Sequence, residues 1–196
     1  MALVLFHSPN SRSARVRWLL EELDIEYAIK LVPREERTSD EHRRRHPLGR
    51  VPALETDQGT IFETAAICLH LAEQHPEAGL LPPEGSFDRA LVYQLISFGL
   101  TEIEPPTADV RRHADSDPER AETARERVRA AIGVITGVLD GREYLLGRNL
   151  SVADILCGSA LFGARRLELT ADVPAVEAYL DRLEARPARQ RAYAAD

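Results

Sequence analysis

The stretch from His46 to Glu73 constrains the fold most, because strand, turn, strand and helix signals follow one another within it. Two short runs, residues 53–56 and 60–63, flank the glycine-containing turn at 57–59, and this pattern predicts a β-hairpin. An amphipathic helix is expected to begin at Thr64, directly after the second run. On pattern alone, an ordinary hairpin packed on a helix accounts for the whole stretch.

Two features of this stretch also suit a ligand. Pro52 has no N–H to give to a strand ladder, so we expect Val51-Pro52 at the start of a strand, with the Val51 backbone available to a ligand. The helix entrance at Glu63-Thr64 exposes backbone N–H groups and partial positive charge, which favour an anion such as a carboxylate.

The residues before this stretch predict a β-α-β unit. Residues 2–6 are wholly apolar, as in a strand buried on both faces, and residues 7–11 have turn chemistry. Apolar residues at helical spacing then continue to Leu23, and residues 26–32 read as a second strand. Such a crossover is expected to be right-handed.

The second half of the chain is predicted to be helical throughout. Pro, Gly and Ser cluster in the segment up to residue 87, which we interpret as a linker at 77–87 between a first domain at 1–76 and an all-helical domain at 88–196. One of its helices has a capping-box variant at its start, with Ser151 as the cap and Asp154 three residues later. Apolar spacing places helices around residues 91–105, 128–139, 151 onward, 173–185 and 187 onward.

Composition narrows the possible partners and compartment. The net charge of −7 and the pI of about 5.4 argue against a nucleic-acid-binding surface, and no apolar run is long enough for a membrane span. The apolar run at residues 2–6 is too short to be the hydrophobic region of a signal peptide. Both cysteines, Cys68 and Cys157, fall in helical apolar patterns and are expected as core residues in a cytoplasmic protein, not as a disulfide.

The polar segment at residues 33–48 contains a histidine pair, His42 and His46, at the i, i+4 spacing that can bind a metal on a helix. No third ligand lies nearby in the sequence. We therefore expect a solvated polar face and no metal site.

The order of elements and four sequence stretches resemble the glutathione transferase superfamily. The stretches are SPNSRSARVRWLLEELDIEY at residues 8–27, HPLGRVPALE at 46–55, Glu63-Thr64, and NLSVADI at 149–155 with VPAVEAYLDRLEARPARQRA at 173–192. The resemblance covers nearly the whole chain. It implies an α/β domain followed by an all-α one: an N-terminal thioredoxin-like βαβ-ββα domain and a C-terminal helical bundle domain.

The resemblance implies a glutathione site in the first domain. Pro52 would be the cis-proline of the fold, and the Val51 backbone would pair with the cysteinyl backbone of glutathione as an added strand does. Thr64 would bind the γ-glutamyl carboxylate through its N–H and hydroxyl, and Glu63 would bind the ammonium group. Two basic residues would lie near the glycyl carboxylate: Arg50 and His46.

Thiol activation is expected in the turn after the first strand, where related proteins carry Tyr, Ser or Cys. This turn has no tyrosine; the theta-like and zeta-like serine falls on Asn10 and the beta-like cysteine on Arg12. Ser11 is the first candidate, followed by Asn10 and Ser13, while Arg12 is expected to stabilise an anion in the glutathione site. Alternatively, Ser11 or Ser13 only caps the helix.

The resemblance further implies that glutathione serves as co-substrate, with no other cofactor, and that a small apolar electrophile is the second substrate. Its pocket is expected between the domains, near Phe98, Thr101 and Pro105. A homodimer is expected, with neither nucleic acid nor membrane as partner. Two alternatives stay open: a glutathione-dependent disulfide or peroxide reductase or isomerase, and a non-catalytic protein of this fold that binds another protein.

Overall fold

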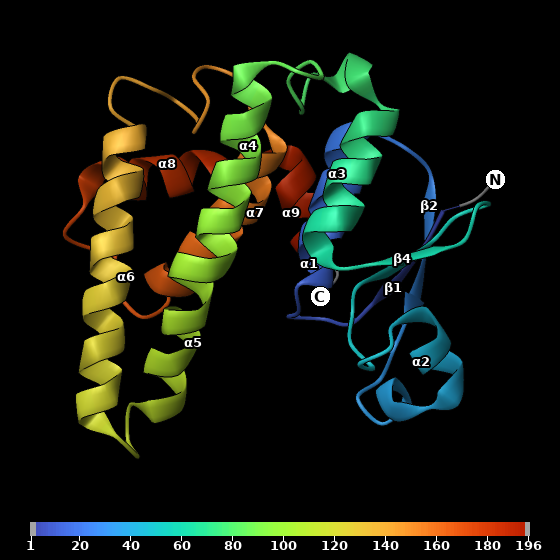
Figure 1. The fold of residues 1–196 in the computed structure, drawn as a ribbon, viewed down its shortest axis with the longest axis horizontal. Helices are drawn as coiled ribbons and strands as arrows, with labels where there is room; N and C mark the ends of the chain where they lie inside the picture. Colours follow the sequence, from blue (N-terminus) through green and yellow to red (C-terminus); the bar gives the residue numbers. More distant parts are fainter. Residues whose placement is uncertain (1–2, 195–196) are drawn as a thin grey trace. The chain divides into compact units, whose positions relative to one another are not determined.

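The computed structural model describes residues 3–194, and its contacts divide the chain into two compact units (Figure 1). The first runs up to Ala78 and includes the residues from Arg186 onward; the second runs from Gly79 to Ala185. The final helix therefore belongs to the first unit, whereas the predicted helical domain extended to residue 196.

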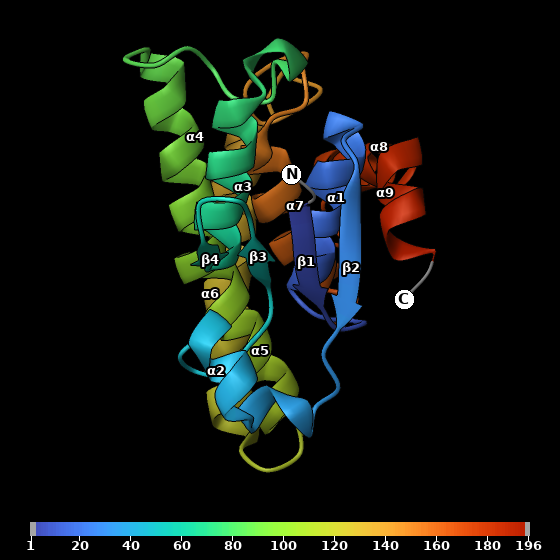
Figure 2. The same ribbon diagram turned by 90° about the vertical axis from the view of Figure 1, so that its right-hand side faces the viewer.

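A four-stranded sheet in the order β2-β1-β3-β4 forms the centre of the first unit (Figure 2). Its strands are β1 (Leu3–His7), β2 (Tyr27–Leu31), β3 (Ala53–Glu55) and β4 (Thr60–Phe62). The β1 strand pairs in parallel with β2 and antiparallel with β3, and β3 pairs antiparallel with β4. The apolar first strand is thus interior, as predicted, although the predicted start at Ala2 lies outside the described residues.

Two helices, α1 (Ser13–Leu23) and α3 (Thr64–Gln74), lie on one face of the sheet (Figure 1). Their apolar faces pack with fully buried sheet residues such as Leu5 and Leu54. The α1 helix ends where Asp24 adopts a left-handed conformation with φ of 52°, a common way to terminate a helix. The short η2 helix (Pro76–Ala78) follows α3.

The last helix of the first unit, α9 (Pro187–Tyr193), packs against α1. Arg186, just before α9, donates hydrogen bonds of 2.6 and 2.7 Å to the two carboxylate oxygens of Glu22 on α1. The same carboxylate accepts the indole N–H of Trp18 at 2.8 Å. Residues more than 160 positions apart therefore share one hydrogen-bonded cluster.

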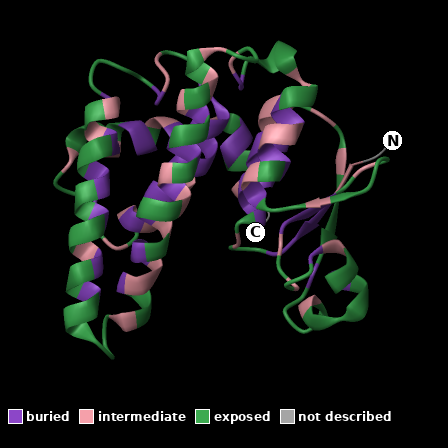
Figure 3. Ribbon diagram, viewed as in Figure 1, coloured by how far each residue is buried: buried purple, intermediate pink, exposed green. Residues whose placement is uncertain are grey.

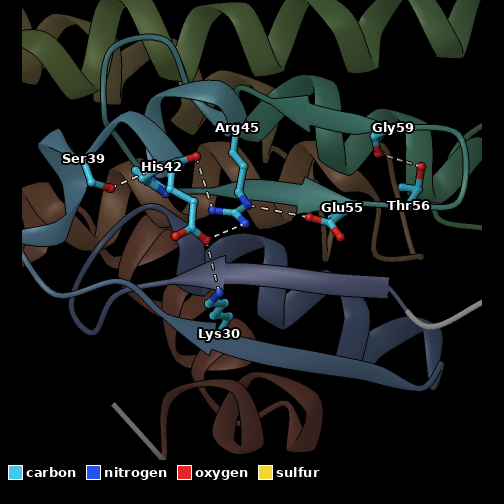
Figure 4. Close-up of polar contacts among 8 residues, drawn as sticks. Lys30, Ser39, His42, Arg45, Glu55, Thr56 and Gly59 are labelled. Atoms are coloured by element: carbon cyan, nitrogen blue, oxygen red, sulfur yellow. Dashed lines mark hydrogen bonds and ion pairs between the residues drawn. The ribbon is translucent and has the colours of Figure 1, made fainter.

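The polar segment between β2 and β3 forms the short helices η1 (Glu36–Thr38) and α2 (Asp40–Arg45). Ser39 caps α2 by accepting the N–H of His42. Arg45 extends from α2 and pairs with Glu41 and Glu55 at 2.9 and 3.7 Å (Figure 4). Its guanidinium also lies over the ring of Phe6, 4.4 Å from the ring centroid. The arginine stem covers an apolar ring while its charge stays paired.

The expectation of a solvated histidine face is wrong. His42 and His46 are each only 3% exposed, because the short α2 helix turns this face toward the protein. Nε2 of His42 lies 2.8 Å from the carbonyl oxygen of Arg50, and the ring of His46 lies 5.1 Å from that of Phe62. Within residues 3–194, no three His, Cys, Asp or Glu side chains are grouped so that they could hold a metal ion.

The second unit consists of helices, as predicted. They are α4 (Phe87–Phe98), η3 (Gly99–Ile103), α5 (Glu104–His113), α6 (Pro118–Val138), α7 (Val152–Arg165) and α8 (Pro174–Glu184). Buried positions follow one face of α6 but continue around most of α7, which is the central helix of this unit (Figure 3). None of the helices in the described part of the chain is long and apolar enough to cross a membrane.

The predicted capping box at the start of α7 is present. Asp154 is fully buried and accepts hydrogen bonds from the Ser151 N–H at 2.8 Å and the Ser151 hydroxyl at 2.7 Å. The same carboxylate also accepts the N–H of Leu145 and the hydroxyl of Tyr179. Burial raises the pKa of Asp154, and these four donors oppose that rise.

The η3 segment is a π-helical turn between α4 and α5. Pro105 and Pro106 have no N–H, and at the turn before them the N–H of Glu104 bonds to the carbonyl of Gly99, five residues back. The sequence predicted that a first helix would run up to these prolines; instead they stand in the first turn of α5, where a missing N–H costs least. A Cβ on Gly99 would lie 3.0 Å from Cα of Cys157, so glycine permits close packing on α7.

Candidate functional site

Three strand ends meet at one edge of the sheet. Phe6 pairs with Ala53, and Ala53 pairs with Phe62. Because β3 is antiparallel to both neighbours, the chain beyond these pairs lies at one edge of the sheet. This edge holds His7 and its turn after β1, Val51-Pro52 before β3, and Glu63-Thr64 after β4. The register thus brings together three segments that the sequence singled out separately.

The peptide bond between Val51 and Pro52 is cis, as the resemblance implied. Pro52 is buried and Val51 half-buried, next to the small apolar cluster around Phe6 and Ala53. The preceding residue, Arg50, is exposed, and its carbonyl is held by His42. In the described part of the chain, no hydrogen bond engages the Val51 backbone, so its N–H and carbonyl are available to an extended peptide.

The entrance of α3 has an unusual backbone. Glu63 has φ of 74° and ψ of 121°, a conformation that non-glycine residues rarely adopt, and such strain concentrates at functional sites. Glu63 is exposed, whereas Thr64 at the first helical position is 5% exposed. No side chain caps this helix in the described structure. Its first N–H groups and the Thr64 hydroxyl can therefore bind a carboxylate.

The turn between β1 and α1 holds a network of hydroxyl groups. The Ser11 and Ser13 hydroxyl oxygens lie 2.6 Å apart, and that of Ser13 lies 2.8 Å from Nδ1 of His7. Ser11 also donates to the carbonyl of Ser8 at 2.7 Å, and the Ser8 N–H donates to the Ser13 hydroxyl at 3.1 Å. Arg37 of η1 donates to the Ser8 hydroxyl at 2.6 Å.

The four candidate residues of this turn differ in exposure. Ser13 is fully buried and Ser11 half-buried, whereas Asn10 and Arg12 are exposed. Asn10 has a left-handed backbone with φ of 54°. Arg12, not Ser11 or Ser13, occupies the N-cap position of α1, and its side chain does not cap the helix. Neither serine is thus the N-cap residue, although the Ser11 hydroxyl accepts the N–H of Ser13, the first residue of α1, at 3.3 Å.

His46 is buried near Glu63. Burial lowers the pKa of His46, and the neighbouring Glu63 carboxylate opposes this shift. Nδ1 of His46 accepts the N–H of Leu48 at 3.3 Å, which requires the neutral ring. The side chain therefore sits as an uncharged imidazole beside the Phe62 ring.

The sequence did not single out His7, Ser8 or Arg37. A histidine that ends a buried strand and a serine that opens the following turn were the available signals. The contact with Arg37 could not be seen, because 29 positions separate it from Ser8.

Cys68 is not a candidate nucleophile: burial raises the pKa of its thiol to about 12.

The candidates for a second-substrate pocket lie in the second unit. Phe98 is half-buried at the end of α4, Thr101 is exposed in η3, and Pro105 is exposed in the first turn of α5. The Thr101 hydroxyl donates to the carbonyl of Ser97 within the same helical run. The three residues thus belong to one continuous stretch around the π-helical turn.

Comparison with known proteins assigns both halves of the chain. Residues 1–73 match the family model "Glutathione S-transferase, N-terminal domain", and residues 96–187 match "Glutathione S-transferase, C-terminal domain". A glutathione transferase structure from Methylococcus capsulatus superposes with a TM-score of 0.89 at 28% identity, over 99% of this chain and 98% of that one. A sphingomonad glutathione S-transferase complexed with glutathione is 32% identical, with a TM-score of 0.86 over 98% of both chains.

Curated relatives have several different names. Glutathione S-transferase GstA of Escherichia coli O157:H7 is 25% identical over 98% of both chains. Maleylacetoacetate isomerase of Dictyostelium discoideum is 29% identical over 82% of this chain and 78% of its own length. Elongation factor 1-gamma of Trypanosoma cruzi is 28% identical over 82% of this chain, which spans only 40% of that protein.

Proposed function

We propose that this chain, which belongs to the glutathione S-transferase family, is an enzyme that binds glutathione and activates its thiol for attack on small apolar electrophiles. The relatives named glutathione S-transferase and the neighbours solved with glutathione support glutathione chemistry. Conjugation to an electrophile is the specific reaction proposed.

The observation that carries the proposal is the sheet edge where three segments meet. The Val51 backbone offers one N–H and one carbonyl to the cysteinyl part of glutathione, as an added strand would. The uncapped entrance of α3 offers Thr64 for the γ-glutamyl carboxylate, and the Glu63 carboxylate suits the ammonium group. Arg50 and Arg12 are exposed cations, suited to the glycyl carboxylate and to a developing anion respectively.

Within the β1–α1 turn, Ser11 is the residue best suited to contact the sulfur. It is half-buried and carries a hydroxyl, whereas the Ser13 hydroxyl is engaged on several sides in a fully buried position. Asn10 is exposed and is the second choice. A hydroxyl that donates to the thiolate favours the ionised form of a thiol whose ordinary pKa is about 8.5.

Calorimetry with glutathione and turnover of an aromatic halide test this function. Wild-type protein should bind glutathione and consume the halide in proportion to enzyme, and Ser11→Ala should slow turnover more than it weakens binding. Absence of binding at millimolar glutathione would reject the proposal.

Isomerisation is a second candidate, because the maleylacetoacetate isomerase relative aligns over most of both chains. Glutathione-dependent reduction of disulfides or peroxides belongs with it, since the turn contains no tyrosine. Assays with a cis-enone diacid, a mixed disulfide and a peroxide separate these reactions from conjugation. Consumption of glutathione into a thioether marks conjugation, whereas isomerisation leaves the glutathione concentration unchanged.

A binding role without catalysis is favoured by the similarity to elongation factor 1-gamma, the name of a translation factor. Bound glutathione whose thiol titrates as it does in free solution would support this role.

Two further proposals are a second-substrate pocket near Phe98, Thr101 and Pro105 and a homodimer. Sedimentation equilibrium tests the dimer, and Thr101→Trp should alter the KM for the electrophile without altering glutathione binding.

A further inference from the structure

The hydroxyl network of the β1–α1 turn includes a buried histidine. His7 is 1% exposed at the last position of β1, and its Nδ1 lies 2.8 Å from the Ser13 hydroxyl oxygen. That oxygen lies 2.6 Å from the Ser11 hydroxyl oxygen. Three groups thus form an unbroken chain, from a half-buried serine at the site to an imidazole inside the protein.

We propose that His7 accepts the proton of the glutathione thiol through Ser13 and Ser11, and so generates the thiolate. The inference rests on the proposed function, with Ser11 as the residue that touches the sulfur. His7 and Ser13 are positioning residues, because they act on the sulfur only through Ser11.

The donor pattern permits this transfer. Either hydroxyl can donate in the Ser11–Ser13 contact, and Nδ1 of His7 donates or accepts according to its tautomer. Before transfer, the thiol S–H donates to Ser11, Ser11 donates to Ser13, and Ser13 donates to the neutral ring. Each proton then moves one place along the chain. The S–H bond breaks, an N–H bond forms at Nδ1, and a thiolate and an imidazolium result.

After transfer, every hydrogen bond of the chain points toward the sulfur. His7 donates to Ser13, Ser13 to Ser11, and Ser11 to the thiolate, so that each bond polarises the next. Of the three groups in this relay, only the imidazole has a nitrogen that can take up the proton; the serine hydroxyls pass it on. The Ser8 carbonyl oxygen lies 2.7 Å from the Ser11 hydroxyl oxygen and 3.2 Å from that of Ser13. Because each hydroxyl has a single proton, it turns away from this carbonyl when it donates along the chain. The Arg37 guanidinium contacts this network through the Ser8 hydroxyl.

Two variants break the chain at different links. His7→Gln keeps a side chain that can bond to Ser13 but takes up no proton, and Ser13→Ala removes the middle hydroxyl. Ser159→Ala is the matched control, because it also deletes a serine hydroxyl, on α7, whose bond is to the carbonyl of Ile155 in its own helix. Circular dichroism identifies the variants that fold, and Ser13→Ala decides alone if His7→Gln does not.

The readout is the pKa of the bound glutathione thiol, from the ultraviolet absorbance of the thiolate, with binding measured by calorimetry. Both variants should bind glutathione like wild type but raise the thiol pKa by about one unit, which means about tenfold less thiolate at neutral pH. Their loss in kcat/KM should shrink at alkaline pH, where the thiol ionises unaided. Ser159→Ala should match wild type.

Three outcomes overturn the relay. One is a thiol pKa unchanged in folded His7→Gln or Ser13→Ala, which would leave these residues a structural role only. Another is a wild-type thiol pKa that equals that of free glutathione despite binding. A third is a wild-type protein that binds no glutathione, in which case the proposed function falls too; in the first two outcomes glutathione binding survives and the relay alone is rejected.

Discussion

At the scale of single residues, Thr64 joins backbone geometry to ligand chemistry. Its hydroxyl lies at an uncapped helix entrance, immediately after the strained Glu63 backbone. Thr64→Val preserves shape and removes one hydrogen bond to the γ-glutamyl carboxylate. We expect glutathione to bind about tenfold more weakly by calorimetry, since a hydrogen bond to a charged group contributes about 1.5 kcal/mol.

Thr60→Val is the matched control for Thr64→Val, because Thr60 is exposed on β4 and outside the proposed site. It should leave the dissociation constant unchanged. Equal binding by wild type and Thr64→Val would remove Thr64 from the glutathione contacts.

Residue-level expectations were most accurate where the chemistry is local. The Ser151–Asp154 box and the helical entrance at Thr64 each depend on neighbours in sequence, and both are present. The cis bond before Pro52 is present too, but it was implied by the family resemblance and not by its neighbours. His42 and His46 were misread, because i, i+4 spacing defines a shared helix face without saying whether it meets solvent or protein. Only the packing of α2 against the Arg50 carbonyl and the Phe62 ring decides that.

At the scale of elements, the Glu22 carboxylate ties α9 to α1. Its side chain is 7% exposed and pairs with Arg186 through two hydrogen bonds. Glu22→Gln removes the charge and leaves the guanidinium partly uncompensated. We expect a loss of about 2 kcal/mol in the free energy of unfolding of the first unit, less than for a fully buried pair because Arg186 is 28% exposed.

Trp18, the only tryptophan of the chain, reports this change directly, because it bonds to Glu22 and lies under the Arg189 guanidinium. Urea unfolding followed by its fluorescence should show a lower midpoint for Glu22→Gln. Glu26→Gln, at an exposed position after α1, should not shift the midpoint. An unshifted Glu22→Gln curve would mean that the Glu22–Arg186 pair does not contribute measurably to the attachment of α9.

A second element-level prediction concerns α7. Asp154→Asn replaces an acceptor of four hydrogen bonds with an amide that cannot accept them all, inside a fully buried site. The second unit should lose about 2–4 kcal/mol of stability, measured by chemical denaturation with circular dichroism. Asp140→Asn, on the exposed turn after α6, is the control and should have no effect. An equally small effect of both substitutions would contradict the role assigned to the box.

The helical periodicity of the sequence predicted most elements of the second half, including the buried face of α6 at Val128, Ile132 and Ile135. Two features of that half were not foreseen. The π-helical turn depends on how Pro105 and Pro106 are accommodated, and the assignment of α9 to the first unit depends on long-range pairs such as Arg186 with Glu22. The hydroxyl network was missed likewise, because sequence proximity does not fix side-chain direction.

At the scale of the whole molecule, the two units should respond differently to acid. In the first unit, the folded pKa of His46 is lowered by burial. The stability that His46 contributes to this unit is therefore present above about pH 6.5 and is lost as pH falls through the folded pKa. Burial raises the pKa of Glu21, but bonds from Tyr27 and Arg191 outweigh it, so the net shift is downward. Its contribution is present above about pH 4.5 and is lost at lower pH.

Asp154 in the second unit has the opposite sign. Its folded pKa is raised, so acidification from neutral pH relieves the cost of its buried charge. The first unit should therefore unfold at a higher pH than the second, which Trp18 fluorescence and far-ultraviolet circular dichroism can separate. His46→Asn, which keeps an acceptor for the Leu48 N–H without a titrating ring, should flatten the fluorescence change below pH 6.5. An unaltered acid profile of His46→Asn would assign that change to other groups.

The π-helical turn η3 has a consequence for chain length. Adding or deleting one residue in an α-helix rotates every later side chain by about 100° around the axis. Because η3 closes its hydrogen bond over five residues, it holds one residue more than an α-helical turn while α4 and α5 continue as one helical run. Deletion of one residue between Leu100 and Glu102 would convert the π-helical turn η3 to an α-helical turn. The side chains of α5 would keep their direction around the helix axis. A one-residue deletion here should therefore cost little stability, and it would remove one side chain beside Thr101.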